Sequence, residues 1–193
     1  MDLCGHATLA AAYAITGCGG DGRVEFKSRS GTLAIEVARG LVTMRFPVRV
    51  PAPAEAPRAL LDAVNANPAA VLKSRDWVFV YPCEDEVRDM RIDRTVFDTI
   101  NINPGGLCVT APGRDADFVS RFFTPQATIL EDPVTGSAHC SLVPYWAKVL
   151  GKPELTAMQL SARGGTLYCA LEDNAVVIAG HAVLYKKGVI HAG

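Results

Sequence analysis

The residues best suited to chemistry lie in ILEDPVTGSAHCSL, where an apolar strand gives way to a helix in the second half of the chain. Asp132 precedes Pro133, which favours an extended backbone and holds this acid just before the helix begins. Thr135, Gly136 and Ser137 then place two hydroxyl groups and a tight turn at the helix start. The first N–H groups of a helix lack partners within it, and its dipole favours an anion. The stretch therefore predicts acid–base chemistry on a bound anion.

The chain opens with a second stretch of the same kind, MDLCGHATLAAAYAIT. Gly5 supplies the turn, and His6 is a titratable side chain at the start of an apolar helix. Two such helix starts facing one cleft would bind a substrate carboxylate and stabilise the enolate-like charge of a proton-transfer transition state. We therefore expect His6, Asp132 and Ser137 to converge, with Gly5 and Gly136 letting the ligand approach the backbone.

Each of these side chains also has an ordinary structural interpretation. Asp132 could complement the helix dipole, Thr135 and Ser137 could serve as helix N-caps, and His6 could be a hydrogen-bonded core residue. Glu131 is expected to point away from Asp132, into structure or solvent. The matched pair of helix starts favours the functional interpretation for the set.

Other reactive side chains fit less well. His139 lies two residues beyond Ser137 and projects in a different direction, and no G-x-S-x-G elbow exists, so a hydrolase triad is disfavoured. Cys140 is expected in the core. Cys4 is expected to be a buried thiol; alternatively, its position at the helix start could lower the pKa of the thiol. Arg163 could hold a carboxylate or form a salt bridge at a strand end.

Composition limits the class of protein. The chain has 193 residues, 49% of them hydrophobic, and a net charge of −1, and its basic residues are scattered, so we expect no nucleic-acid partner. No apolar run reaches the roughly 18–20 residues of a membrane span, and we expect no membrane partner. Close cysteine–histidine pairs lack zinc-site spacing, which predicts no metal. The cysteines are widely spread along the chain, which predicts reduced thiols and a cytoplasmic protein. The six cysteines are Cys4, Cys18, Cys83, Cys108, Cys140 and Cys169.

Hydrophobic periodicity predicts three main helices and a series of strands. The alanine-rich helix near 7–17 should be buried on every side, and the helix near 137–150 should be delayed or kinked by Pro144. A surface helix is expected over 56–66, and another helix near 94–100. Strands are expected at 23–28, 31–37, 41–48, 76–82, 106–112, 118–124, 165–171 and 175–185.

The two halves of the chain are similar to each other. Phe26–Val37 aligns with Leu160–Leu171 without a gap, and GTL recurs in both. Unless this similarity is due to chance, it predicts an α+β fold with two pseudo-repeated lobes, each a curved antiparallel sheet wrapped around a helix. Residues 1–50 would be the remainder of a first lobe whose front strands and helix are missing. Residues 51–193 would form the second lobe, with the C-terminal strand able to return to the first.

Four stretches, DLCGHATLAAAY, DFVSRFFTP, EDPVTGSAHCSL and SARGGTL, resemble the signature stretches of the PhzF-type phenazine-biosynthesis-like family. The resemblance implies the two-lobed fold of diaminopimelate epimerase, a homodimer, and isomerisation by proton transfer on a small carboxylate-bearing metabolite without a cofactor. It implies that His6, Asp132 and Ser137 are catalytic. The substrate is expected to be bound by Cys4, Gly5, Thr135 and Gly136.

One departure from the family pattern affects the expected activity. The principal acid/base glutamate of the family lies upstream of CGHAT, and no residue of this chain matches it. A truncated isomerase is therefore expected to be weak or inactive, and the alternative is a non-catalytic remnant that binds a small carboxylate. A two-cysteine racemase is disfavoured, because the place equivalent to Cys4 in the second motif is occupied by Thr135.

Overall fold

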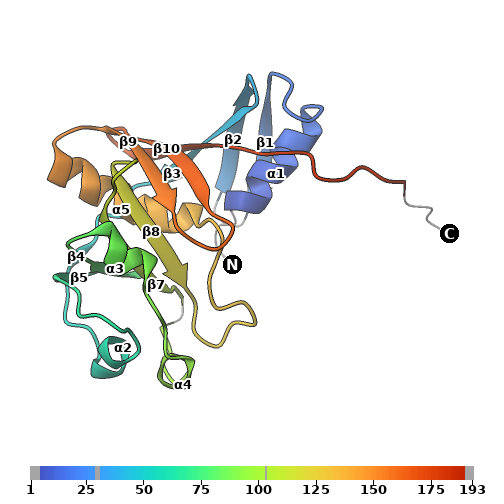
Figure 1. The fold of residues 1–193 in the computed structure, drawn as a ribbon. Helices are drawn as coiled ribbons and strands as arrows, with labels where there is room; N and C mark the ends of the chain where they lie inside the picture. Colours follow the sequence, from blue (N-terminus) through green and yellow to red (C-terminus); the bar gives the residue numbers. More distant parts are fainter. Residues whose placement is uncertain (1–4, 29–30, 103, 190–193) are drawn as a thin grey trace. The chain divides into compact units, whose positions relative to one another are not determined.

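The computed structural model describes residues 5–28, 31–102 and 104–189, and the chain divides into two compact units. Unit 1 is Met1–Arg45 with Ala179–Gly193, and unit 2 is Phe46–Ile178. Figure 1 labels most helices and strands of both units, with β6 and β11 left unlabelled. None of the helices in the described ranges is long and apolar enough to cross a membrane.

Unit 1 contains a helix and a three-stranded antiparallel sheet. The elements are α1 (Gly5–Ile15), β1 (Gly22–Ser28), β2 (Gly31–Ala38) and β3 (Leu41–Pro47), of which the last two residues belong to unit 2. β2 pairs with both β1 and β3, and α1 lies beside it (Figure 1). The period-two alternation of a half-buried strand is visible in β2, where Ile35 and Val37 are buried and Glu36 is exposed.

The burial of α1 differs from the expectation. Gly5 and Ala12 are buried, whereas Ala10, Ala14 and Ile15 are exposed, so the helix is not enclosed on every side. Alanine favours a helix through its backbone propensity whether or not the side chain is covered. The sequence therefore predicted the helix correctly and its burial wrongly.

Unit 2 contains a sheet with the strand order β10-β9-β8-β7-β6-β5-β4, and β11 lies next to β10. The strands are β4 (Ala52–Pro53), β5 (Ala70–Lys73), β6 (Trp77–Val80), β7 (Leu107–Pro112), β8 (Phe118–Phe123), β9 (Glu154–Gln159), β10 (Gly165–Leu171) and β11 (Ala175–His181), the last of which continues into unit 1. The helices are α2 (Arg58–Asp62), α3 (Glu84–Arg88), α4 (Arg94–Phe97) and α5 (Gly136–Leu150).

This sheet is mixed, although a wholly antiparallel sheet was expected. β6 is parallel to β7, and β8 is parallel to β9. Parallel neighbours need a crossover connection, which here contains α3 and α4 in the first case and α5 in the second. Strand composition alone does not reveal which strands a crossover brings together, so the sequence predicted the strands and not their directions.

The central strand β7 is buried on both faces, and its alternating side chains separate two packing layers. Val109 belongs to a core that includes residues of the short helices, such as Leu60 and Phe97. Thr110 faces α5, where its Oγ1 accepts a hydrogen bond from Trp146 Nε1 over 2.9 Å, and the Trp146 ring stacks on Phe118. Packing against the sheet thus buries α5 along most of its length.

Pro144 does not delay the start of α5, because Gly136 to Leu150 form one helix. Proline lacks the N–H that would have bonded to the carbonyl of Cys140 within the helix. That carbonyl instead accepts the backbone N–H of Arg49 over 3.0 Å. A segment distant in sequence therefore satisfies the group that proline leaves unpaired.

The helix expected over 56–66 is limited to Arg58–Asp62. Just beyond it, Val64 forms an isolated antiparallel bridge with Ile92, and the Ala63 carbonyl accepts the N–H of Asp93. These non-local backbone contacts end the helical pattern that the local sequence favours.

Candidate functional site

The segment before α5 is attached by its backbone to the C-terminal end of β8. Phe123 and Glu131 form an isolated antiparallel bridge, and the Asp132 N–H donates to the Phe122 carbonyl over 3.0 Å. Arg121 binds the Glu131 carboxylate through two hydrogen bonds of 2.7 and 3.0 Å. Glu131 therefore anchors the segment to β8, which leaves the neighbouring Asp132 available at the helix start.

Gln159, at the end of β9, holds the turn between Asp132 and Thr135. It is 1% exposed, and its Oε1 accepts the Thr135 N–H over 2.7 Å. Its Nε2 donates to the Asp132 carbonyl over 2.7 Å and to Thr135 Oγ1 over 3.1 Å. Because the backbone N–H identifies the acceptor end of the amide, the orientation of the whole Gln159 side chain is determined.

The Asp132 carboxylate is oriented by Thr135. The Thr135 hydroxyl accepts from Gln159, so its own hydrogen is directed to Asp132 Oδ2, 2.6 Å away. The described ranges of the chain offer Asp132 Oδ1 no hydrogen-bond donor. One oxygen of a half-buried carboxylate is therefore held in place while the other can exchange a proton with a ligand.

Thr135 is the N-cap residue of α5, but its side chain does not cap the helix. The hydroxyl donates to Asp132, and it accepts no hydrogen bond from the first-turn N–H groups. Side-chain capping is therefore not the role of Thr135, and the positive end of the α5 dipole is not neutralised by its own N-cap.

A glycine-containing turn packs against this segment. Ser161 Oγ donates to the Pro133 carbonyl over 2.7 Å and accepts the Gly164 N–H over 3.0 Å. A Cβ on Gly165 would lie 2.5 Å from a methyl group of Val134, so the close approach requires glycine. The SARGGTL and EDPVTGSA stretches are thus in direct contact.

Ser137, in the first turn of α5, is buried and contacts a cation. Arg75 Nη2 donates to Ser137 Oγ over 3.3 Å, and Arg75 is also paired with the buried Asp76. One helical turn further on, the hydroxyls of Ser141 and Ser74 are 2.6 Å apart.

His139 and Cys140 belong to the core of α5. The His139 Nδ1–H donates to the Thr135 carbonyl over 2.8 Å, and complete burial lowers the pKa of His139 to about 4. Its Nε2 has no hydrogen-bond partner among the described residues. Burial also raises the pKa of Cys140 to about 11. The burial of Cys140 fits its expected place in the core, and a neutral, buried His139 fits the expectation that it is not part of a hydrolase triad.

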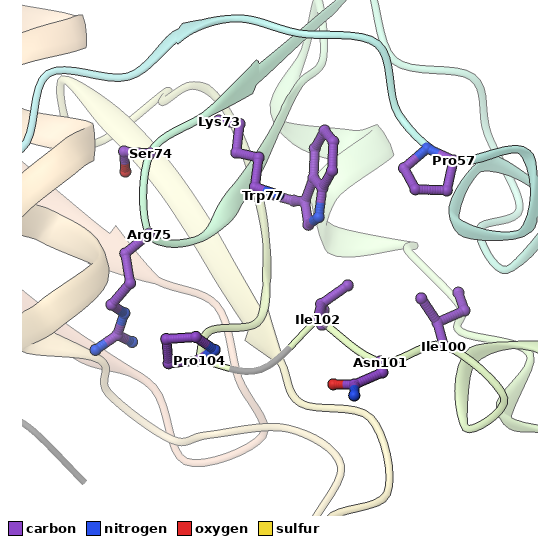
Figure 2. A pocket seen from close by; sticks show the side chains of 9 residues that line it. All are labelled: Pro57, Lys73, Ser74, Arg75, Trp77, Ile100, Asn101, Ile102 and Pro104. Carbon is purple, nitrogen blue, oxygen red and sulfur yellow. The ribbon is translucent and has the colours of Figure 1, made fainter.

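A pocket of about 350 Å³ lies beside the turn that carries Ser74 and Arg75. Figure 2 shows Lys73 next to the Trp77 ring and Arg75 pointing away from that ring. The Lys73 Nζ lies 4.3 Å from the centroid of the Trp77 ring. The remaining lining residues are Pro57, Ile100, Asn101, Ile102 and Pro104.

The first predicted motif lies in unit 1. Gly5 is buried and His6 is exposed at the start of α1, and Cys4 lies outside the described residues. Arg163 is exposed on unit 2. The convergence of His6 with Asp132 and Ser137 stays a prediction from the sequence.

The sequence interpretation missed Gln159 and Arg75. A signal for Gln159 was present, because the alternation of ELTAMQ places it on the same buried face as Leu155 and Ala157. A polar side chain on a buried face needs hydrogen-bond partners, and here those partners belong to the site. Among the residues in the described ranges, no group of His, Cys, Asp or Glu side chains is arranged to hold a metal ion.

Known proteins are similar to this chain in both sequence and fold. Residues 1–188 match the PhzC-PhzF family of phenazine biosynthesis-like proteins. An uncharacterized isomerase from Pseudomonas aeruginosa is 46% identical over 191 residues, covering 97% of this chain and 72% of that protein. A PhzF-family phenazine biosynthesis protein from Enterococcus faecalis superposes with a TM-score of 0.92 at 36% identity, covering 100% of this chain and 74% of that one.

A more distant structure shows the fold alone. A hydroxyproline epimerase from Agrobacterium vitis superposes with a TM-score of 0.52 at 11% identity, over 92% of this chain and 63% of that one. Together with the PhzF structure it confirms the predicted α+β, diaminopimelate epimerase-like fold. By sequence over nearly its whole length and by structure, the chain belongs to the PhzC-PhzF family of phenazine biosynthesis-like proteins.

Proposed function

We propose that this protein is an isomerase that transfers a proton on a small carboxylate-bearing molecule without a cofactor, with Asp132 as an acid–base group. Membership of a family whose relatives are named isomerases supports the reaction class. The observation that carries the assignment of Asp132 is its geometry. Gln159 and Thr135 hold its backbone and Oδ2 in place, while Oδ1 has no donor among the described residues.

The remaining roles in the proposal follow from residue type and position. Ser137 and the Gly136 backbone would bind the substrate carboxylate at the start of α5, with Thr135 orienting Asp132. His6 would be the second acid–base group, with Gly5 and Cys4 contributing to substrate binding; these assignments rest on the sequence motif alone. We further propose a cytoplasmic homodimer.

Hydrogen exchange with solvent tests the proposal without knowledge of the product. A base that removes a C–H proton and returns a deuteron from D2O replaces hydrogen by deuterium in the substrate, which proton NMR detects as a lost signal. The protein is incubated in D2O with a panel of small carboxylates that carry an acidic C–H, including cyclic amino acids and unsaturated ring carboxylates. We expect slow exchange with at least one of them, because no residue of this chain matches the principal acid/base glutamate of the family, and loss of that exchange in Asp132→Asn.

Asp115→Asn is the matched control, because Asp115 is an exposed acid on the loop after β7. We expect it to exchange like the wild-type protein. Exchange that persists undiminished in Asp132→Asn would overturn the role of Asp132. Carboxylate binding without exchange would favour the alternative, a protein that binds a small carboxylate without transforming it.

A further inference from the structure

Arg75, on the turn between β5 and β6, is joined to the start of α5. Its Nη2 donates to Ser137 Oγ over 3.3 Å, although the two residues are 62 positions apart in sequence. The neighbouring Ser74 contacts the Ser141 hydroxyl over 2.6 Å, one helical turn further along α5. Two contacts one turn apart hold this turn against the helix, so the Arg75 contact is part of the packing of unit 2.

The guanidinium of Arg75 is itself held by a buried acid. Asp76 is 1% exposed, and its Oδ1 accepts from Arg75 Nε over 3.2 Å and from Nη2 over 3.1 Å. The same oxygen accepts the Gly106 N–H over 3.0 Å. A Cβ on Gly106 would lie 2.4 Å from the Phe122 ring, so only glycine allows this approach. Asp76 therefore fixes the plane of the guanidinium before any ligand binds.

The contact determines what the Ser137 hydroxyl can do. A hydroxyl has one hydrogen to donate and two lone pairs that accept. Arg75 occupies a lone pair of Ser137 Oγ, so the hydroxyl hydrogen is left to be donated elsewhere. A cationic donor also polarises the hydroxyl and strengthens the hydrogen bond that it donates. An anion at the start of α5 would receive this hydrogen bond together with those of the first backbone N–H groups.

We propose that Arg75 is a positioning residue of this site, which holds Ser137 so that its hydroxyl donates to a carboxylate or another oxyanion bound at the start of α5. The inference rests on the proposed function in one respect, namely that this oxyanion is the carboxylate group of the substrate. Arg75 acts through Ser137, and Asp76 acts through Arg75. The effect of Arg75 therefore falls on anion affinity and disappears when Ser137 has no hydroxyl.

Isothermal titration of the full chain with benzoate and with sulfate tests this inference. We expect Arg75→Met to raise the dissociation constant of both anions about tenfold, the factor that corresponds to one charge-assisted hydrogen bond. Arg75→Lys should recover part of the affinity, because an ammonium also donates to Ser137. In the Ser137→Ala background, Arg75→Met should change the dissociation constant less than about twofold. A residue with a merely structural role would weaken binding in both backgrounds alike.

Arg58→Met is the control for loss of one positive charge, because Arg58 is exposed and pairs only with Asp62 among the ion pairs of the described chain. We expect it to leave both affinities unchanged. If Arg75→Met binds as tightly as the wild-type protein, or loses the same factor with and without the Ser137 hydroxyl, the inference on Arg75 is wrong and the proposed function stands. If the wild-type protein binds neither benzoate nor sulfate, the anion site of the proposed function itself is wrong.

Discussion

The side-chain oxygen of Gln159 accepts a hydrogen bond from the backbone N–H of Thr135 over 2.7 Å, and both residues are buried. The amide nitrogen of the same side chain bonds to the Asp132 carbonyl and to the Thr135 hydroxyl. A residue of β9 thereby orients the acid that precedes α5. Positioning of the candidate acid–base group thus depends on sheet packing as well as on the helix start.

Gln159→Leu should destabilise the protein by about 2–4 kcal/mol, because it removes the partners of a buried N–H and of a partly buried carbonyl. The measurement is urea unfolding at pH 7. Thr166→Val, at an exposed position of the neighbouring strand β10, serves as the control and should change the stability by less than about 0.5 kcal/mol. A Gln159→Leu protein as stable as the wild type would show that these hydrogen bonds contribute little.

His139 should make the stability depend on pH between 7 and 5. Burial lowers its pKa to about 4 in the folded protein, whereas the pKa in the unfolded chain is about 6.5. Between these values the unfolded chain binds the proton more readily, so the free energy of unfolding falls as pH falls. The expected loss from pH 7 to pH 5 is about 2 kcal/mol.

Urea unfolding of His139→Asn at pH 7 and pH 5 tests whether His139 causes this pH dependence of stability. The variant can still donate a side-chain N–H near the Thr135 carbonyl but does not titrate, so its stability should be nearly constant over the interval. His181→Asn, which changes an exposed histidine, should keep the wild-type dependence. A His139→Asn protein that loses stability as steeply as the wild type would assign the effect to other groups.

Arg121→Met should cost about 3 kcal/mol of stability. Arg121 is mostly buried, binds Glu131 through two hydrogen bonds, and donates Nη1 to carbonyls of α3 and of the turn after it. Its removal leaves a partly buried carboxylate and several carbonyls with fewer donors. The comparison is Arg23→Met, which breaks the exposed pair with Glu25 and should cost less than about 0.5 kcal/mol. Equal effects in the two variants would contradict the role given to Arg121.

Gly165→Ala should destabilise the protein by about 1–3 kcal/mol, because the new methyl group would lie 2.5 Å from Val134, which directly precedes Thr135. Thermal unfolding of Gly165→Ala, Val134→Ala and the double variant measures the energetic coupling between positions 165 and 134. The double variant should be more stable than the sum of the single effects predicts, because shortening Val134 makes room for the methyl group. Gly188→Ala, at an open position, should be neutral. Additive effects would show that the two residues do not clash.

Local chemistry made the start of α5 predictable. Pro133 restricts the preceding backbone, Gly136 allows the tight turn, and the apolar run beyond Ser137 indicates a buried helix, so Asp132 and Ser137 could be placed near one helix start from the sequence. The motifs also indicated the family and its fold. These inferences succeed because each depends on residues that are close neighbours in the chain.

Contacts between distant segments decided the rest. The alternation in β9 places Gln159 on a buried face, but only the packing of β9 against the segment before α5 makes Asp132 and Thr135 its partners. The Arg75–Ser137 contact and the Arg49–Cys140 hydrogen bond likewise join segments that are far apart in sequence. A local pattern specifies which backbone and side-chain groups need partners, whereas the identity of those partners is set only when crossover connections bring distant segments together.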